Sequence, residues 1–253
     1  MTPTARPIRR VLLTVSYDGT GYSGWQRQEN AMSVQQRLEE ALQKALRKKT
    51  AVTGASRTDA GVHALCQMAH FDTDSTIPDG KFPFVLNNLL PYDIRVTAAR
   101  PVPDDFHARF SCRGKTYTYR MHNAAHASAI FRNITCHVPV HLNEAVMDAA
   151  AKQVIGTHDF KAFAAAGGSA KTTVRTITKA GVTRQGEQVT LMVSGNAFLY
   201  NMVRILAGTL IEIGQGSLAP EALTQALATG DRLALGPTAP PQGLELTRVE
   251  YDI

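Results

Sequence analysis

The sequence predicts an α+β fold in which two similar halves share one extended sheet. Strands and helices alternate twice along the chain, and no clear linker separates the two series. The length of 253 residues and the hydrophobic content of 44% suit one large domain or two of ordinary size with a real core. We place an N-terminal α/β lobe at residues 1–107 and a C-terminal α/β lobe at residues 108–253.

The first half opens with a strand and a helix that have strong local signals. Side chains alternate over residues 11–17, which predicts a strand ending at the turn Asp18–Gly21. Ser33 and Gln36 form a capping box, and apolar residues at helical spacing follow to residue 46. The further elements expected are a strand over 67–72, a short helix over 83–90 and a strand over 94–102.

The second half begins with a strand over residues 114–122. Tyr117, Tyr119 and Met121 share one face of this strand. Asn143 is expected to cap a helix that runs to Val154. The remaining expectations are strands over 174–183 and 188–194 joined by a hairpin turn, helices over 199–213 and 220–228, and a last strand over 244–253.

Charge and cysteine usage narrow the class of protein. A formal net charge of +6 and a pI of about 9.3 fit a polyanionic partner, although many proteins without one are also basic. Cys66, Cys112 and Cys136 are odd in number and far apart, which indicates reduced thiols in the cytosol. No run of 18 apolar residues occurs, so we expect no membrane span.

Chemistry is most strongly indicated by the segment from Ala55 to Leu65. It places Arg57 and Asp59 before the small residues Ala60 and Gly61, which allow a tight turn and the close approach of a ligand. A carboxylate near an arginine stays ionised and can act as nucleophile or base. Taken alone, however, an Asp before a small residue is also a common turn residue.

This segment resembles the signature of the TruA family, tRNA pseudouridine synthase I, which usually has the form G-R-T-D-A-G-V-H-A. Ser56 stands where the family usually has Gly. Further stretches resemble the family in the same order along nearly the whole chain: residues 17–28, 33–42, 113–120, 158–163, 197–204 and 239–244. A match in this order is far more specific than any single motif.

The resemblance implies a fold and an activity. It implies the pseudouridine synthase fold, an extended, mostly antiparallel sheet with helices packed on it and a central basic cleft. It also implies a cytoplasmic homodimer that converts uridine to pseudouridine in the anticodon stem-loop of tRNA (tRNA positions 38–40). No metal and no cofactor is implied.

The same resemblance implies roles for individual residues. The catalytic nucleophile of the family falls on Asp59, the loop arginine on Arg57, the active-site tyrosine on Tyr117 and the basic helix residue on Arg204. Leu244 matches an apolar residue that lines the pocket. An aromatic face such as Tyr117 could hold a flipped base, Arg204 could pair with Asp59 or a phosphate, and Arg57 could fill the gap left in the RNA helix.

Several alternatives remain open at this point. Tyr117 could simply pack in the core, and Asp59 could be structural in a non-catalytic RNA-binding protein. A synthase acting on another RNA is a further possibility. Histidines four residues apart are not expected to bind zinc, because no third ligand accompanies them. Some basic residues could line an RNA surface or form a solvated face: Lys115, Arg120, Arg132, Lys171, Arg175 and Arg184.

Overall fold

The computed structural model describes residues 7–253, which form two compact units with ten strands and five α-helices between them. The first unit contains the chain up to Arg113 together with Leu246–Ile253, and the second contains Gly114–Glu245. The expected α+β class and antiparallel pairing are confirmed. The first unit runs to Arg113 and includes most of the last strand. The lobe boundary placed after residue 107 stays a prediction.

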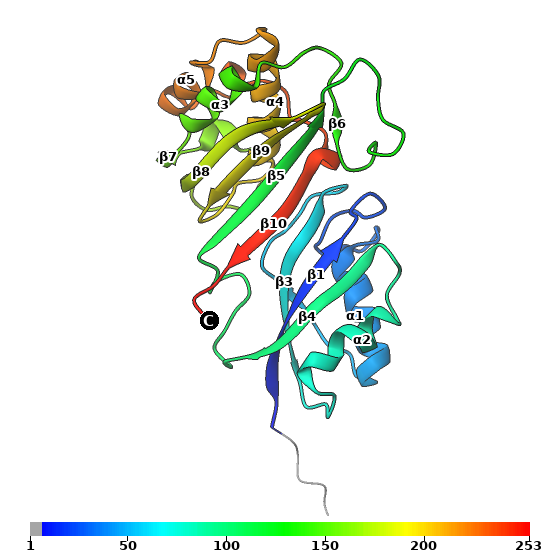
Figure 1. Cartoon of the computed structure of the whole chain (residues 1–253). Helices are drawn as coiled ribbons and strands as arrows, with labels where there is room; N and C mark the ends of the chain where they lie inside the picture. The colour runs from blue at the N-terminus through cyan, green and yellow to red at the C-terminus, as the bar shows by residue number, and fades with distance from the viewer. Residues whose placement is uncertain (1–6) are drawn as a thin grey trace, which may run out of the picture. The chain divides into compact units, whose positions relative to one another are not determined.

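The first unit is built on a sheet with the strand order β4-β1-β3-β10, in which β1 pairs antiparallel with β3 and β4 and β2 pairs antiparallel with β3. Val11, Leu12 and Leu13 of β1 are each at most 1% exposed, as expected for a central strand. Helices α1 and α2 lie on one side of this sheet (Figure 1). The bounds are β1 Arg9–Tyr17, α1 Val34–Leu46, β2 Thr53–Gly54, β3 His63–Thr73, α2 Phe82–Asn87, β4 Ile94–Val102 and β10 Leu244–Glu250.

Local signals predicted most of this unit correctly. Helix α1 begins where expected, and the Ser33 side chain accepts a hydrogen bond from the Gln36 N–H at 3.2 Å. Strand β4 has the predicted bounds. Strand β3 starts at His63 rather than at residue 67, and β2 was not predicted, because two residues are too few to show an alternating pattern.

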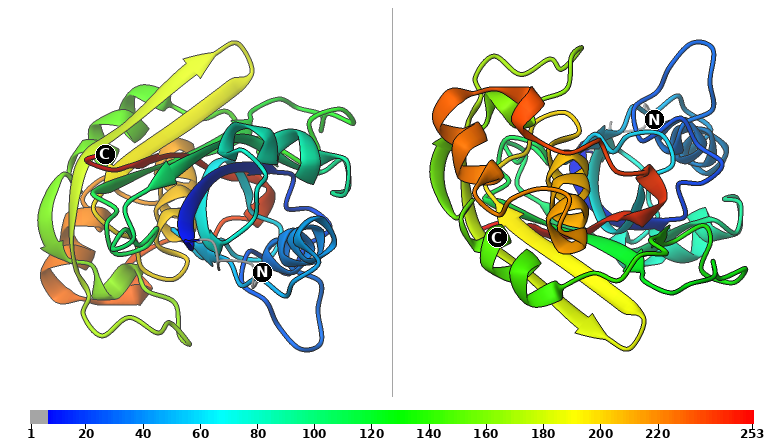
Figure 2. Two further views of the ribbon diagram at one scale, coloured as in Figure 1. Left: turned by 90° about the horizontal axis from the view of Figure 1, so that it is seen from below. Right: turned by 90° about the horizontal axis from the view of Figure 1, so that it is seen from above.

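The second unit has the strand order β5-β9-β8-β7, all antiparallel, with β6 parallel to β5. Helices α3, α4 and α5 lie together beside β8 and β9 in Figure 1, and Figure 2 shows the same elements from below and from above. The bounds are β5 Gly114–His122, β6 Cys136–His137, α3 Glu144–Lys152, β7 Gly156–Asp159, β8 Val174–Gln185, β9 Gln188–Gly195, α4 Met202–Gln215 and α5 Ala222–Thr229.

The predicted elements of this unit are present, with one informative shift. Asn143 caps α3 by accepting the Val146 N–H at 3.2 Å, and β5 has the predicted bounds. Helix α4 starts at Met202 rather than at Leu199, because Asn201 adopts the left-handed conformation with φ 59°. None of the helices in residues 7–253 is both long enough and apolar enough to cross a membrane.

Candidate active site

Asp59 lies in the loop that joins β2 to β3 in the first unit. The Ala55 N–H donates to the Met68 carbonyl oxygen at 2.8 Å, which ties the start of the loop to β3. The Val62 N–H donates to the Asp59 carbonyl oxygen at 3.1 Å and closes a turn in which Gly61 has φ +76°. The partly exposed carboxyl group therefore stands on a short turn that is held at both ends.

Two side chains from neighbouring strands fix the loop before Asp59. The amide of Gln67, fully buried at 0% exposure, accepts the Ser56 N–H at 3.1 Å and donates to the Ser56 carbonyl at 2.7 Å. The hydroxyl groups of Tyr17 and Thr58 lie 2.7 Å apart and share a buried hydrogen bond. Sequence reasoning missed the role of Gln67, since a polar residue within a predicted strand carries no signal of its partner.

Gly24 supports the loop from the turn after β1. The Trp25 N–H donates to the Thr58 carbonyl oxygen at 3.0 Å. Gly24 has φ +86°, and a Cβ atom there would lie 2.4 Å from the same carbonyl oxygen and 3.0 Å from the carbonyl carbon of Asp59. Only glycine allows the backbone to approach the Asp59 loop so closely.

Arg57 is exposed at the surface of the same loop. Within residues 7–253 its guanidinium group makes no side-chain hydrogen bond and no ion pair. Its side chain is therefore available to meet a ligand rather than committed to holding the loop.

Tyr117 lies on β5 of the second unit, opposite Val193 of β9. It is 7% exposed, and its ring meets the ring of Phe198 edge to face with centroids 5.1 Å apart. The neighbours on its strand face, Tyr119 and Met121, are fully buried. The ring is thus held in a fixed orientation by aromatic and apolar packing.

Arg204 is in the first turn of α4, where two contacts orient its guanidinium group. Its Nε donates to the Ala239 carbonyl oxygen at 2.8 Å, and its Nη1 donates to Oδ1 of Asn201 at 2.9 Å. The Ala239 N–H returns a hydrogen bond to the Arg204 carbonyl oxygen at 3.0 Å. The left-handed Asn201 that shortens the helix therefore also serves to position the arginine.

Leu244 follows the loop that binds Arg204 and is 5% exposed. The Tyr119 hydroxyl donates to the Pro240 carbonyl oxygen at 2.8 Å, and a Cβ on Gly243 would lie 2.6 Å from the Tyr119 ring. Burial raises the pKa of Tyr119 far above its usual value, so the hydroxyl stays neutral and remains a donor. Tyr119 therefore fixes the position of the closing loop, residues 239–243, which directly precedes Leu244.

The predicted site residues fall into two groups. Arg57 and Asp59 share one loop of the first unit. Tyr117, Arg204 and Leu244 belong to the second unit, where the closing loop links the surroundings of Arg204 to those of Leu244.

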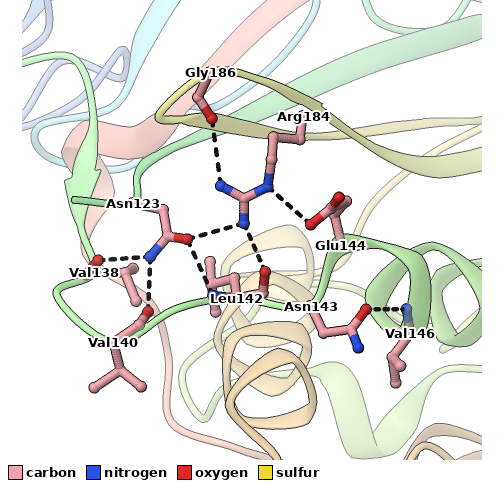
Figure 3. Close-up of polar contacts among 9 residues, drawn as sticks. All are labelled: Asn123, Val138, Val140, Leu142, Asn143, Glu144, Val146, Arg184 and Gly186. Carbon is pink, nitrogen blue, oxygen red and sulfur yellow. Dashed lines mark hydrogen bonds and ion pairs between the residues drawn. The ribbon is translucent and has the colours of Figure 1, made fainter.

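The basic residues considered for an RNA surface are not equivalent. Arg184 is held by Glu144 at 2.8 Å, by Oδ1 of Asn123 at 2.9 Å and by the Leu142 carbonyl at 2.6 Å (Figure 3). Arg120 forms an ion pair with the nearly buried Glu245. These two arginines stabilise the second unit, whereas Lys171 and Arg132 are exposed.

The histidines that lie four residues apart, His122 with His126 and His137 with His141, belong to no group of three ligands in the described part of the chain. The rings of His122 and His137 lie 6.0 Å apart, and Nε2 of His137 is 2.8 Å from the Ala124 carbonyl oxygen. No group of three or more His, Cys, Asp or Glu side chains in the described part of the chain could hold a metal ion.

Comparison with known proteins decides the family. The family model described as tRNA pseudouridine synthase matches residues 13–111 and 150–252. The chain belongs to the tRNA pseudouridine synthase family. Enzymes of this kind isomerise uridine to pseudouridine in tRNA, so the family and the activity inferred from the motifs are confirmed.

Individual relatives agree with this assignment. The chain is 50% identical to tRNA pseudouridine synthase A of Ruminiclostridium cellulolyticum over 96% of this chain and 100% of that protein. It is 45% identical to the enzyme of the same name from Acetivibrio thermocellus, again over 96% and 100%. A chain in the crystal structure of a Cbf5–Nop10–Gar1 complex shares 14% identity at a TM-score of 0.36, over 93% of this chain and 48% of that one, which adds nothing to the assignment.

Proposed function

We propose that this chain converts uridine to pseudouridine in the anticodon stem-loop of tRNA (positions 38–40), with Asp59 as the nucleophile. In this reaction the bond between N1 of uracil and C1′ of ribose breaks, the base rotates, and a bond from C5 to C1′ forms. The bond that Asp59 makes to the substrate breaks again, C5 loses its proton and N1 takes one up, so the product is an isomer of the substrate. The observation that carries the proposal is Asp59 on a short turn, within a segment that matches the family signature.

The surroundings of Asp59 suit a nucleophile that must be placed accurately. Its loop is held by the Gln67 amide, by the Tyr17 hydroxyl and by the close approach of Gly24. A reacting group held in this way loses little freedom when the substrate binds, which favours catalysis through orientation.

The second unit would supply groups that receive the base. Tyr117 would stack against the flipped uracil, Leu244 would line the pocket, and Arg204 would bring a positive charge to the carboxylate or to a phosphate. Arg57, exposed on the Asp59 loop, would occupy the space that the flipped base leaves in the RNA. These roles rest on the family resemblance, and the fixed orientations of Tyr117 and Arg204 support them.

We further propose a cytoplasmic homodimer in which one tRNA touches both subunits. Free thiols at all three cysteines are compatible with the reducing cytosol. Light scattering of the purified protein, alone and with tRNA, tests the oligomeric state. A monomer that is fully active would contradict the dimer without affecting the role of Asp59.

Substitution of Asp59 tests the proposed chemistry. In Asp59→Asn the amide has nearly the shape of the carboxylate but is not nucleophilic, so turnover should fall to background while tRNA binding is kept. Release of tritium from tRNA labelled at C5 of uridine measures turnover, and filter binding measures affinity. Asp74→Asn, a surface carboxylate paired only with Lys48, is the matched control and should remain active.

The same assay separates the rival functions. A non-catalytic RNA-binding protein would bind tRNA but release no tritium even as the wild type. A synthase for another RNA would release tritium from ribosomal RNA and not from the anticodon arm. Clear residual turnover in Asp59→Asn would overturn the nucleophile assignment.

A further inference from the structure

His63 is the first residue of β3 and lies four positions after Asp59. We propose that it is a positioning residue that fixes the Asp59 loop in place against the turn after β1. This inference rests on the proposed catalytic role of Asp59. It concerns a side chain that does not need to touch the substrate.

The contact of His63 with the turn is specific for one nitrogen. Its Nδ1 accepts the Gly19 N–H at 3.0 Å. This bond requires Nδ1 to act as the acceptor. Oδ1 of Asp18 lies 3.2 Å from the same nitrogen and accepts the Thr20 N–H at 2.9 Å, which keeps the turn closed beside the ring.

The turn after β1 also contacts the backbone around Asp59. A Cβ on Gly19 would lie 2.0 Å from the Val62 carbonyl oxygen, so the two segments are in close backbone contact. The Gly61 N–H donates to the Tyr22 carbonyl oxygen at 3.2 Å, and the Val62 N–H donates to Asp59. A shift of the turn would therefore be transmitted directly to the residue that carries the carboxylate.

The simpler interpretation is that His63 only fills the core. It is 6% exposed, but its Nε2 is buried without a hydrogen-bond partner among the described residues. Burying an unsatisfied polar atom is unfavourable, and an apolar side chain of similar size would avoid that penalty. Packing alone therefore does not explain a histidine here, whereas a hydrogen bond to Gly19 does.

Three substitutions distinguish positioning from packing. His63→Asn places its side-chain oxygen near the position of Nδ1 and can still accept the Gly19 N–H. His63→Gln places its oxygen near the position of Nε2, and His63→Leu offers no acceptor. If positioning is the role, His63→Gln and His63→Leu should lower kcat about tenfold to a hundredfold, since small misplacements have effects of this size.

A loss of positioning should affect kcat much more than substrate binding. KM and the Kd for tRNA should stay within about twofold of the wild type, and His63→Asn should recover most of kcat. Equal kcat for the Asn and Gln variants, or a His63→Leu enzyme with wild-type kcat, would overturn the inference. If His63→Leu does not fold, the comparison of Asn with Gln still decides. Wild-type and Asp59→Asn enzymes assayed in parallel show separately whether the proposed function holds.

Discussion

Replacement of Gly24 by alanine would test how strongly the activity depends on the turn that supports Asp59. The added Cβ would lie 2.4 Å from the Thr58 carbonyl oxygen, whereas ordinary contacts begin at 3.4 Å. The loop or the turn must therefore move by about 1 Å, a displacement that can reduce catalysis about a hundredfold. The methyl group would be directed at the residue next to Asp59.

The effect on stability can be worked out from the same geometry. Gly24 has φ +86°, and holding a residue with a Cβ in the left-handed region costs roughly 1–2 kcal/mol. Weakening the hydrogen bond from Trp25 to Thr58 adds about 1 kcal/mol. We expect the free energy of unfolding of Gly24→Ala to fall by about 2–3 kcal/mol.

A second glycine of the same turn provides the control. Gly21 has no atom within 4 Å of the position that a Cβ would take, and its φ is not in the left-handed region. Gly21→Ala should change the unfolding free energy by less than about 0.5 kcal/mol and leave kcat unaltered. Urea unfolding measures stability, and tritium release at saturating tRNA measures kcat.

The two variants together can refute the reasoning. A Gly24→Ala enzyme with wild-type kcat would show that the position of the Asp59 loop does not depend on this turn. Equal losses in both variants would show that the turn, rather than its contact with the loop, is what matters.

Three other outcomes follow from the structure. Arg184→Ala removes the group that links Asn123, Leu142 and Glu144, so the free energy of unfolding should fall by about 2–3 kcal/mol in urea titrations. The affinity for tRNA should not change. Arg132 is exposed, and Arg132→Ala should be as stable as the wild type. Burial, with a contribution from the charge of Arg10, lowers the pKa of His70 from 6.5 to about 4. As the pH falls, this histidine is therefore protonated in the unfolded chain before it is protonated in the folded chain. The stability due to neutral His70 should be complete above pH 6.5 and lost as pH falls to 4, by about 2–3 kcal/mol, and His70→Asn should flatten that dependence in thermal melts. If tRNA binding involves about five phosphates, the logarithm of the affinity should fall with the logarithm of salt at a slope of about −3.5 to −4.5, and a curve insensitive to salt would contradict electrostatic binding.

The local elements were predictable because their signals lie within a few residues. The Ser33 and Asn143 caps, the alternation over β5 and the two-residue hairpin turn at Gly186 all appear where the sequence places them. The start of α4 was missed, because Asn tolerates the left-handed conformation but its presence alone does not show that residue 201 adopts it.

The order of motifs along the chain was enough to identify the family. The roles of Asp59, Tyr117 and Arg204 stay predictions, and the motifs did not show how these residues are supported. They did not reveal that the buried amide of Gln67 holds the loop before Asp59, or that Ala239 orients Arg204. Ala239 acts through its backbone carbonyl, and Gln67 binds the backbone of Ser56. Every residue has backbone groups, so residue identity does not reveal these pairings.

The sequence by itself thus determined the class of fold, the family and the choice of Asp59 as the candidate nucleophile, because helix caps, strand alternation and motif order are local properties of the chain. Only the tertiary structure distinguished residues of the same type, by showing which of them are held in structural contacts and which are exposed. Arg184 is committed to a structural network while Arg57 is exposed, and Gly24 is essential to a close approach while Gly21 is not. The physical reason is that packing between segments distant in the chain determines which groups are buried, paired or left to meet a substrate.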